Sequence, residues 1–211
     1  VTTPQGFKDA YKQFVENRWQ SAALDKKYGG QGLPYIFNVF FDEIITSSNM
    51  GFSNYPGLTG NAFEAIKKSA SEELKKLYLP KMATGEWTGT MNLTEPQCGT
   101  DLGLSKAIAS PQKDGSYKLT GTKIFITGGE QDLSENIIHL VLARTPGAPK
   151  GIKGISLFLV PKVIPNSDGS LGERNSLSCG SIEDKMGIKS SSSCVMHYNE
   201  VKSWLVGDLH K

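Results

Sequence analysis

The sequence predicts an α+β protein in which an all-α helical domain precedes an antiparallel β-barrel or sandwich domain. From Phe7 to Gly85 apolar residues recur with the period of a helix, whereas after Trp87 apolar and polar residues alternate as in strands. A run of helices followed by a run of strands is typical of α+β chains. We place the boundary so that residues 1–88 form the helical domain and residues 89–211 form the β domain.

The first two expected helices differ in their expected burial. Gly29–Gly32 between them is expected to be a plain turn, because it lacks the glycine spacing and the Lys-Ser/Thr pair of phosphate-binding loops. Tyr35–Ser47 is apolar almost all round, which predicts a buried helix. The helix before the turn is expected to be amphipathic, because its apolar residues fall on one face: Phe7, Ala10, Tyr11, Phe14 and Val15.

Two more helices are expected before the boundary. One covers Asn61–Ser69. The other begins after Ser71, whose hydroxyl can cap a helix, and Glu72 and Glu73 favour the positive end of its dipole. Because proline lacks an amide hydrogen and crowds the preceding turn, Pro80 is expected to kink or end this helix.

Strands are expected throughout the second part of the chain. Asp114-Gly115 is a hairpin signal, and residues alternate in polarity from Tyr117 onward. Further strands are predicted at Ile137–Ala143, Ile155–Val160 and Cys194–Tyr198, with proline and glycine between them.

Composition excludes several classes of protein. The 211 residues include 23 Lys and Arg against 21 Asp and Glu, so the formal net charge is only +2. This balance argues against a duplex-binding protein, which concentrates basic residues to neutralise phosphates. With 38% hydrophobic and 21% charged residues, the chain can form a core and is not a disordered polyelectrolyte. The longest apolar stretch, Tyr35–Phe41, is far too short to span a bilayer.

Cysteine and histidine spacing predicts no metal site and no disulfide framework. The three cysteines have no C-x-x-C spacing, which fits a reducing compartment. His139 is expected to be a sheet residue, and His197 and His210 are expected at the surface. No second ligand stands at metal-binding distance from any of them along the chain.

The stretch Gly89–Asp101 is the most informative part of the chain. It lies at the predicted junction of the two domains, where small-molecule sites tend to form. Its Thr-Glu-Pro turn and the Gly-Thr-Asp that follows offer backbone amides, two hydroxyls and a flexible glycine, which would suit a planar or phosphate-bearing ligand. From the residues alone, a connecting loop held by side-chain turns is the better interpretation.

This stretch closely resembles the first signature of the acyl-CoA dehydrogenase family. Four further segments resemble that family in the same order: Tyr78–Glu86, Leu119–Gly129, Lys150–Pro161 and Lys185–Ile188. The connection from 165 to 183 and the phrases at 181–185 and 192–196 look most like the branch that contains 3-methylmercaptopropionyl-CoA dehydrogenases. The resemblance runs from the first helix to the end of the chain, and it implies a helical domain followed by a flavin-binding β domain, with the family's C-terminal helical bundle absent here.

The resemblance implies that FAD is the cofactor and that its ring lies against the β domain. Phe125 would cover the ring, and Thr127 would offer its hydroxyl to the flavin nitrogen that accepts hydride. Gly99 and Thr100 would approach the pyrophosphate, with Thr100 also on the substrate side. The implied cofactor-binding residues are Met91, Leu93, Thr94, Gly99, Thr100, Phe125, Ile126 and Thr127.

The implied reaction is α,β-dehydrogenation of an acyl-CoA thioester, an oxidation of a CH–CH donor as in fatty acid β-oxidation. By the resemblance, Glu95 is expected to structure the loop rather than to accept the α-proton. The catalytic base is expected beyond Lys211, so this chain carries no catalytic residue and alone would be inactive.

The same resemblance implies partners and a location. We expect an acyl-CoA substrate, an electron-transferring flavoprotein as electron acceptor, and a homo-oligomer, dimer or tetramer, in the complete protein. No nucleic acid, metal or membrane span is expected. The expected location is the bacterial cytoplasm, with the mitochondrial matrix as the alternative.

Two alternatives to the dehydrogenase remain open at this point. The first is a relative that resembles acyl-CoA oxidases or flavin monooxygenases, in which dioxygen reoxidises the flavin; rapid reoxidation of substrate-reduced protein in air would favour it. The second is a non-catalytic module that binds acyl-CoA or flavin, which a colourless protein that still binds acyl-CoA would favour.

Overall fold

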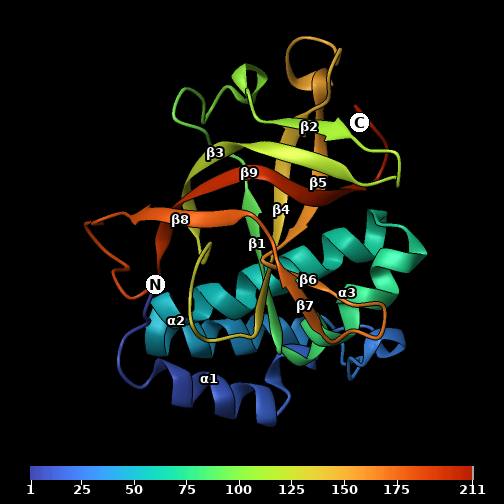
Figure 1. Ribbon diagram of the computed structural model, residues 1–211. Helices are drawn as coiled ribbons and strands as arrows, with labels where there is room; N and C mark the ends of the chain where they lie inside the picture. Colours follow the sequence, from blue (N-terminus) through green and yellow to red (C-terminus); the bar gives the residue numbers. More distant parts are fainter. Residues whose placement is uncertain (211) are drawn as a thin grey trace.

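The computed structural model describes residues 1–210, so Lys211, the last residue of the predicted β domain, lies outside the described residues. The helices lie together at one end of a strongly curved sheet (Figure 1). They are α1 (Phe7–Glu16), α2 (Ile36–Ser69) and α3 (Glu72–Thr84), with short 3-10 helices at Trp19–Ser21, Lys26–Tyr28, Leu102–Leu104 and Ile152–Gly154.

Seven strands form one sheet that closes on itself. Starting from β4, the pairings run through β2, β3, β9 and β5 and return to β4, while β1 adds to β4 and β8 adds to β9. A separate hairpin is made by β6 and β7. The strands are β1 (Trp87–Asn92), β2 (Ile108–Pro111), β3 (Tyr117–Thr127), β4 (Asn136–Arg144), β5 (Ile155–Pro161), β6 (Val163–Pro165), β7 (Leu171–Arg174), β8 (Leu177–Ile182) and β9 (Ser193–Val206).

The predicted α+β order and the barrel are confirmed, but the sheet is not wholly antiparallel. Strand β1 pairs with β4 in parallel from Trp87↔Asn136 onward, and β2 meets β4 in parallel at Ile108↔Arg144. These strands are not consecutive in the chain, so no tight turn forces them to run in opposite directions. The predicted hairpin at Asp114-Gly115 is confirmed, because it joins the antiparallel strands β2 and β3.

Helix α1 packs through the aromatic face that the sequence predicts. Phe7, Tyr11 and Phe14 are buried, and the Phe7 and Phe14 rings meet Phe52 of α2 edge-on. The Tyr11 hydroxyl donates a hydrogen bond of 2.8 Å to the carbonyl of Gly85, which ends α3. This contact joins the first helix to the point where the chain enters the sheet.

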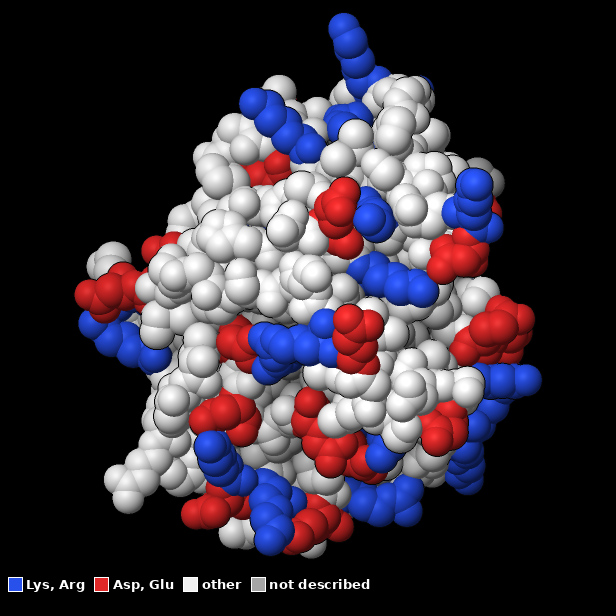
Figure 2. All heavy atoms as spheres, in the orientation of Figure 1, with Lys and Arg blue, Asp and Glu red and all other residues white. Residues whose placement is uncertain are grey.

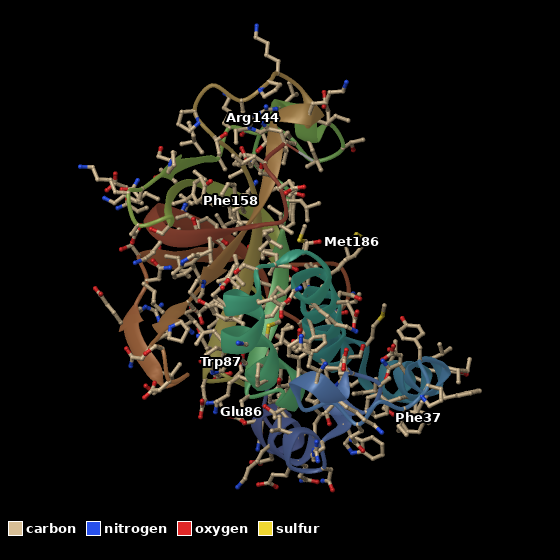
Figure 3. The ribbon with its side chains drawn as sticks, turned by 90° about the vertical axis from the view of Figure 1, so that its right-hand side faces the viewer. Phe37, Glu86, Trp87, Arg144, Phe158 and Met186 are labelled. Atoms are coloured by element: carbon tan, nitrogen blue, oxygen red, sulfur yellow. The ribbon has the colours of Figure 1, made fainter. Side chains whose placement is uncertain are left out.

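The prediction of a buried helix over Tyr35–Ser47 is right about the helix and wrong about its burial. Tyr35 is 75% exposed and Phe40 is 61% exposed. Helix α2 continues to Ser69, so the separate helix expected over Asn61–Ser69 is the end of this same helix. At Asn49 (φ −158°, ψ 97°) the helix kinks, and the Asn49 Oδ1 accepts from the Phe52 amide at 3.0 Å. The kink directs the first half of α2 away from the sheet, as the position of Phe37 in Figure 3 shows.

Helix α3 contradicts the expectation at Pro80. The Ser71 hydroxyl caps the helix as predicted, but the helix continues past Pro80 to Thr84 and ends at Gly85, whose φ is 85°. Proline removes one helical hydrogen bond, but the turns on both sides remain packed, with Leu79 and Met82 fully buried. Tertiary packing therefore outweighs the local penalty.

One large apolar cluster joins the two parts of the chain, and a second one fills the barrel. One joins α2 and α3 to β1, β4 and β5 through Phe63, Tyr78 and Trp87, and the other fills the barrel around Phe158 and Met196. On the face shown in Figure 2, basic and acidic side chains are interspersed, as the small net charge predicts. Among the described residues no helix is both long enough and apolar enough to cross a membrane.

Candidate functional site

The end of β1 and the end of β3 lie side by side, which brings most of the predicted cofactor residues together. Three hydrogen bonds join the two segments. The Thr90 hydroxyl donates to the Thr127 carbonyl at 2.7 Å, and the Ile124 amide donates to the Thr94 carbonyl at 2.9 Å. The Lys123 Nζ donates to the Leu93 carbonyl at 2.9 Å. Residues 90–94 and 123–127 therefore lie directly against each other.

Glu95 organises the loop that follows β1. Its carboxylate is 3% exposed and accepts from the Ser105 hydroxyl, from the amides of Lys106 and Ala107 at 2.8 and 3.1 Å, and from Lys123 Nζ at 2.8 Å. Burial alone would raise the pKa of Glu95, but the hydrogen bonds from Lys123, Ser105 and the Lys106 amide lower it to about 2. The carboxylate is thus ionised and fully engaged in structure.

The same loop brings Gly99 and Thr100 back toward β1. The Glu95 and Cys98 backbones exchange hydrogen bonds of 2.8 and 3.0 Å, which close a tight turn. A methyl group built on Gly99 would lie 3.5 Å from the Thr94 methyl, so Gly99 sits directly beside one of the predicted flavin residues. Thr100 follows it on the exposed side of the turn.

Phe125 has an unusual backbone and an exposed ring. Its φ is +59°, a region that bulky residues rarely adopt, and its side chain is 59% exposed. The register between β3 and β9 shifts between Lys123 and Ile126, which marks a β-bulge. The bulge keeps Lys123 and Ile126 buried and turns Phe125 outward. Strained, exposed aromatic residues of this kind cluster at binding sites.

Three predicted site residues carry hydroxyls that have no partner within residues 1–210: Thr94, Thr100 and Thr127. Apart from Thr2 near the chain start, every other threonine hydroxyl in the chain makes a hydrogen bond, for example Thr90 with Thr127 and Thr122 with His197. The free hydroxyls and the Phe125 ring fit a polar, planar ligand.

The other predicted site residues contribute in different ways. Met91 and Leu93 are half-buried, and Met91 packs against the cluster of the helical part. The Ile126 side chain is buried inside the barrel, so only its backbone could face a ligand. Ile126 therefore serves chiefly to anchor the bulge.

Two structurally important residues were missed at the level of sequence. Lys123 is fully buried, and its place in the alternation after Leu119 and Gly121 was the available signal, because it predicts an inward side chain. Arg144 (Figure 3) donates to four backbone carbonyls: those of Gly103, Ser105, Pro149 and Gly151 at 2.7 to 2.8 Å. It fastens the loop around Thr100 to the loop before β5.

A buried polar cluster lies inside the barrel behind β1. The Tyr198 hydroxyl donates to Asn92 Oδ1 at 2.7 Å and lies 3.2 Å from His139 Nδ1. His139 lies in β4, in the sheet as expected, and its side chain is fully buried. Burial lowers the pKa of His139 to about 3, so its imidazole is neutral. His197 is exposed as expected, while His210 is half-buried.

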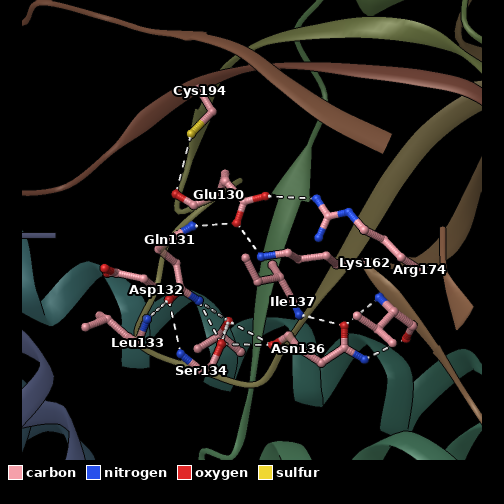
Figure 4. A network of polar contacts seen from close by, with 12 residues as sticks. Glu130, Gln131, Asp132, Leu133, Ser134, Asn136, Ile137, Lys162, Arg174 and Cys194 are labelled. Atoms are coloured by element: carbon pink, nitrogen blue, oxygen red, sulfur yellow. Dashed lines mark hydrogen bonds and ion pairs between the residues drawn. The ribbon is translucent and has the colours of Figure 1, made fainter. Parts of the chain in front are cut away.

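A second polar network holds the segment that follows Thr127 (Figure 4). Glu130 forms ion pairs with Lys162 and, at 3.7 Å, with Arg174, and its carbonyl accepts from the Ser192 hydroxyl at 3.0 Å. The Asn136 side chain pairs with both backbone groups of Val163 at 2.8 and 2.9 Å. The network ties the β6–β7 hairpin to the barrel. Separately, no cluster of three or more potential metal ligands occurs within residues 1–210.

Comparison with known proteins agrees with this architecture. Residues 2–86 match the N-terminal domain of acyl-CoA dehydrogenases, and residues 90–201 match their middle domain. A 3-methylmercaptopropionyl-CoA dehydrogenase of Ruegeria pomeroyi is 49% identical over 208 residues, which are 99% of this chain and 35% of that protein. This chain thus spans about a third of the length of that relative.

Solved structures are similar over almost the whole chain. A Bacillus anthracis acyl-CoA dehydrogenase complexed with FAD superposes with a TM-score of 0.80 at 27% identity, over 97% of this chain and 32% of that one. A chain from a structure of the electron-transferring flavoprotein of Acidaminococcus fermentans superposes with a TM-score of 0.79 at 25% identity, over 96% of this chain and 50% of that one. With both domain matches in chain order, this protein belongs to the acyl-CoA dehydrogenase family.

Proposed function

We propose that this chain is the helical domain (residues 1–88) and the flavin-binding β domain (residues 89–211) of an FAD-dependent acyl-CoA dehydrogenase. The observation that carries the proposal is the joint surface of β1 and β3, where an outward-facing Phe125 lies with free hydroxyls at Thr94 and Thr127. When bound, FAD supplies the hydride acceptor. The protein's part is to orient the ring and to tune its electron affinity.

The residues of this chain fit that task. Phe125 offers an aromatic face to the ring, and the backbone of Met91 to Thr94 offers amides and carbonyls to its polar edge. The Thr127 hydroxyl would donate to the flavin nitrogen that accepts hydride. Gly99 leaves room for the pyrophosphate, and Thr100 would donate to it or to the pantetheine of the substrate.

Glu95 is unsuited to remove the α-proton of the substrate. A general base needs a pKa near the working pH and a free lone pair, whereas the pKa of Glu95 is lowered to about 2 and its oxygens are engaged by Ser105, Lys106, Ala107 and Lys123. We therefore propose that the base comes from the part of the relatives' length that this chain does not span.

Partners and substrate follow from the same proposal. We propose an acyl-CoA thioester as substrate, and the similarity to the Ruegeria pomeroyi protein favours a short thioether-containing acyl group. We propose an electron-transferring flavoprotein as electron acceptor, which the Acidaminococcus fermentans structure supports. The proposed setting is a homodimer or homotetramer in the bacterial cytoplasm.

The test is a flavin titration and an anaerobic reduction of the full-length protein. We expect the protein to bind FAD and the acyl-CoA to bleach the flavin absorbance. Thr127→Val should slow the reduction, whereas Thr122→Val, on the same strand with its hydroxyl paired to His197, should not. A colourless protein that binds acyl-CoA but not FAD would refute the proposal.

A further inference from the structure

The ion pair between Glu95 and Lys123 is buried more completely than any other ion pair in residues 1–210. Its side chains are 0% and 3% exposed for Lys123 and Glu95, and the Nζ–Oε1 distance is 2.8 Å. By contrast, Lys118 on the same strand pairs with Glu200 at the surface, at 3.2 Å. Burying two charges is costly unless both are well paired and hydrogen-bonded. A pair of this kind calls for a role beyond simple stability.

Lys123 joins the two segments that line the proposed flavin site, because it lies in the β3 segment and bonds to the end of the β1 segment. Its Nζ donates to the Leu93 carbonyl at 2.9 Å as well as to Glu95, so it holds the end of β1 from the interior of the protein. The next residue, Ile124, donates its amide to the Thr94 carbonyl at 2.9 Å. A change in the position of the Lys123 side chain would therefore shift the backbone of residues 93 and 94.

Lys123 also fixes the conformation of Phe125. In a regular strand residues 123 and 125 would share a face, and residue 126 would lie on the other. Here Lys123 and Ile126 both point into the core, and the bulge between them resolves the conflict by placing Phe125 at φ +59° with its ring outside. The strained backbone of Phe125 persists because its neighbours on both sides are anchored.

We propose that Lys123 is a positioning residue for the flavin. Anchored by Glu95, it fixes the positions of the Leu93–Thr94 backbone and of the outward Phe125 ring relative to each other. This inference rests on the proposed function, since it assigns Lys123 a task at that same site. It assigns Lys123 no contact with the cofactor or substrate.

The experiment uses Lys123→Met in the full-length protein, with Lys118→Met as the matched control on β3. We expect Lys123→Met to weaken FAD binding by on the order of tenfold, as loss of an outer-shell partner does at metal sites, and to alter the visible circular dichroism of any bound flavin. Hydrogen exchange of the apoprotein should accelerate at residues 93–94 and 124–127. Lys118→Met should leave all three readouts unchanged.

A double variant separates positioning from plain stability. Lys123→Met/Glu95→Gln removes both charges and keeps one acceptor oxygen, which can still serve the Ser105 hydroxyl and the Ala107 amide. Because it leaves no unpaired charge buried, it should fold even where Lys123→Met does not. We expect it to unfold cooperatively while FAD affinity stays low. Wild-type affinity and flavin dichroism in the double variant would overturn the inference. If the wild-type protein binds FAD and the variants equal it, only the inference fails; if the wild type binds none, the proposed function fails with it.

Discussion

The hydroxyl of Thr90 lies 2.7 Å from the carbonyl oxygen of Thr127 and donates a hydrogen bond to it across the seam between β1 and β3. Thr90 is almost fully buried, so Thr90→Val keeps the shape of the side chain but leaves the carbonyl without this donor. We expect the free energy of unfolding to fall by about 1–3 kcal/mol. Urea denaturation measures it, and Thr122→Val, whose hydroxyl pairs near the surface, should change it by only about 0.5 kcal/mol. An unchanged urea midpoint for Thr90→Val would contradict the expectation.

The pKa of Glu95 predicts loss of stability in acid. Because the folded state lowers this pKa from 4.5 to about 2, the unfolded state takes up the proton first as pH falls. The contribution of Glu95 is present above pH 4.5 and is lost between 4.5 and about 2. Denaturation at several pH values should show Glu95→Gln less stable than wild type at neutral pH, with a flatter pH dependence in that window. Equal slopes for the two proteins would contradict the prediction.

His139 predicts a second window of acid sensitivity, which begins at a less acidic pH than that of Glu95. Burial lowers the pKa of His139 from 6.5 to about 3, so the unfolded state binds the proton more readily between these values. Stability should therefore decline as pH falls below 6.5, before Glu95 titrates. His139→Gln should be less stable at neutral pH yet remove this decline, whereas His197→Gln at the surface should preserve it. A decline that survives His139→Gln would assign it to another group.

The exposed half of α2 predicts an unequal response to truncation of aromatic residues. Phe63 is fully buried in the core between α2 and the sheet, so Phe63→Ala should cost about 3–5 kcal/mol. Phe40, on the half of α2 before the kink, is largely exposed, so Phe40→Ala in this chain should stay within about 0.5 kcal/mol. Thermal unfolding of the two variants measures the difference. A comparable loss for Phe40→Ala would mean that this half of α2 packs on another surface in solution.

The order of elements could be predicted from the sequence because each long element has its own period. The aromatic face of α1 and the alternation in β3 are local patterns, and both are confirmed. The burial of Tyr35–Ser47 could not be predicted, since an apolar helix looks the same whether the chain folds it inward or a kink at Asn49 directs it outward. The prediction that Pro80 kinks or ends α3 was wrong for a similar reason, because the packing of α3 against the rest of the core is not a local property of the sequence.

The candidate site was predictable only in part. The family resemblance pointed to Thr94, Thr100 and Thr127, and their free hydroxyls are a property that only the fold reveals. The outward turn of Phe125 does not follow from a regular strand, because it depends on one extra residue in the ladder between β3 and β9. The partner of Lys123 lies in a loop 28 residues earlier in the chain.

The four hydrogen bonds that Arg144 donates determine which part of the candidate site would loosen first in acid. All four acceptors of Arg144 are backbone carbonyls, which carry no titratable group, so protonation of carboxylates leaves these hydrogen bonds intact. The loops at 103–105 and 149–151 therefore stay fastened to each other when Glu95 takes up a proton. Acid loosening would start at the Glu95 turn and spread toward Leu93 and Phe125, so the proposed flavin site would lose this edge while the two loops joined by Arg144 kept their shape.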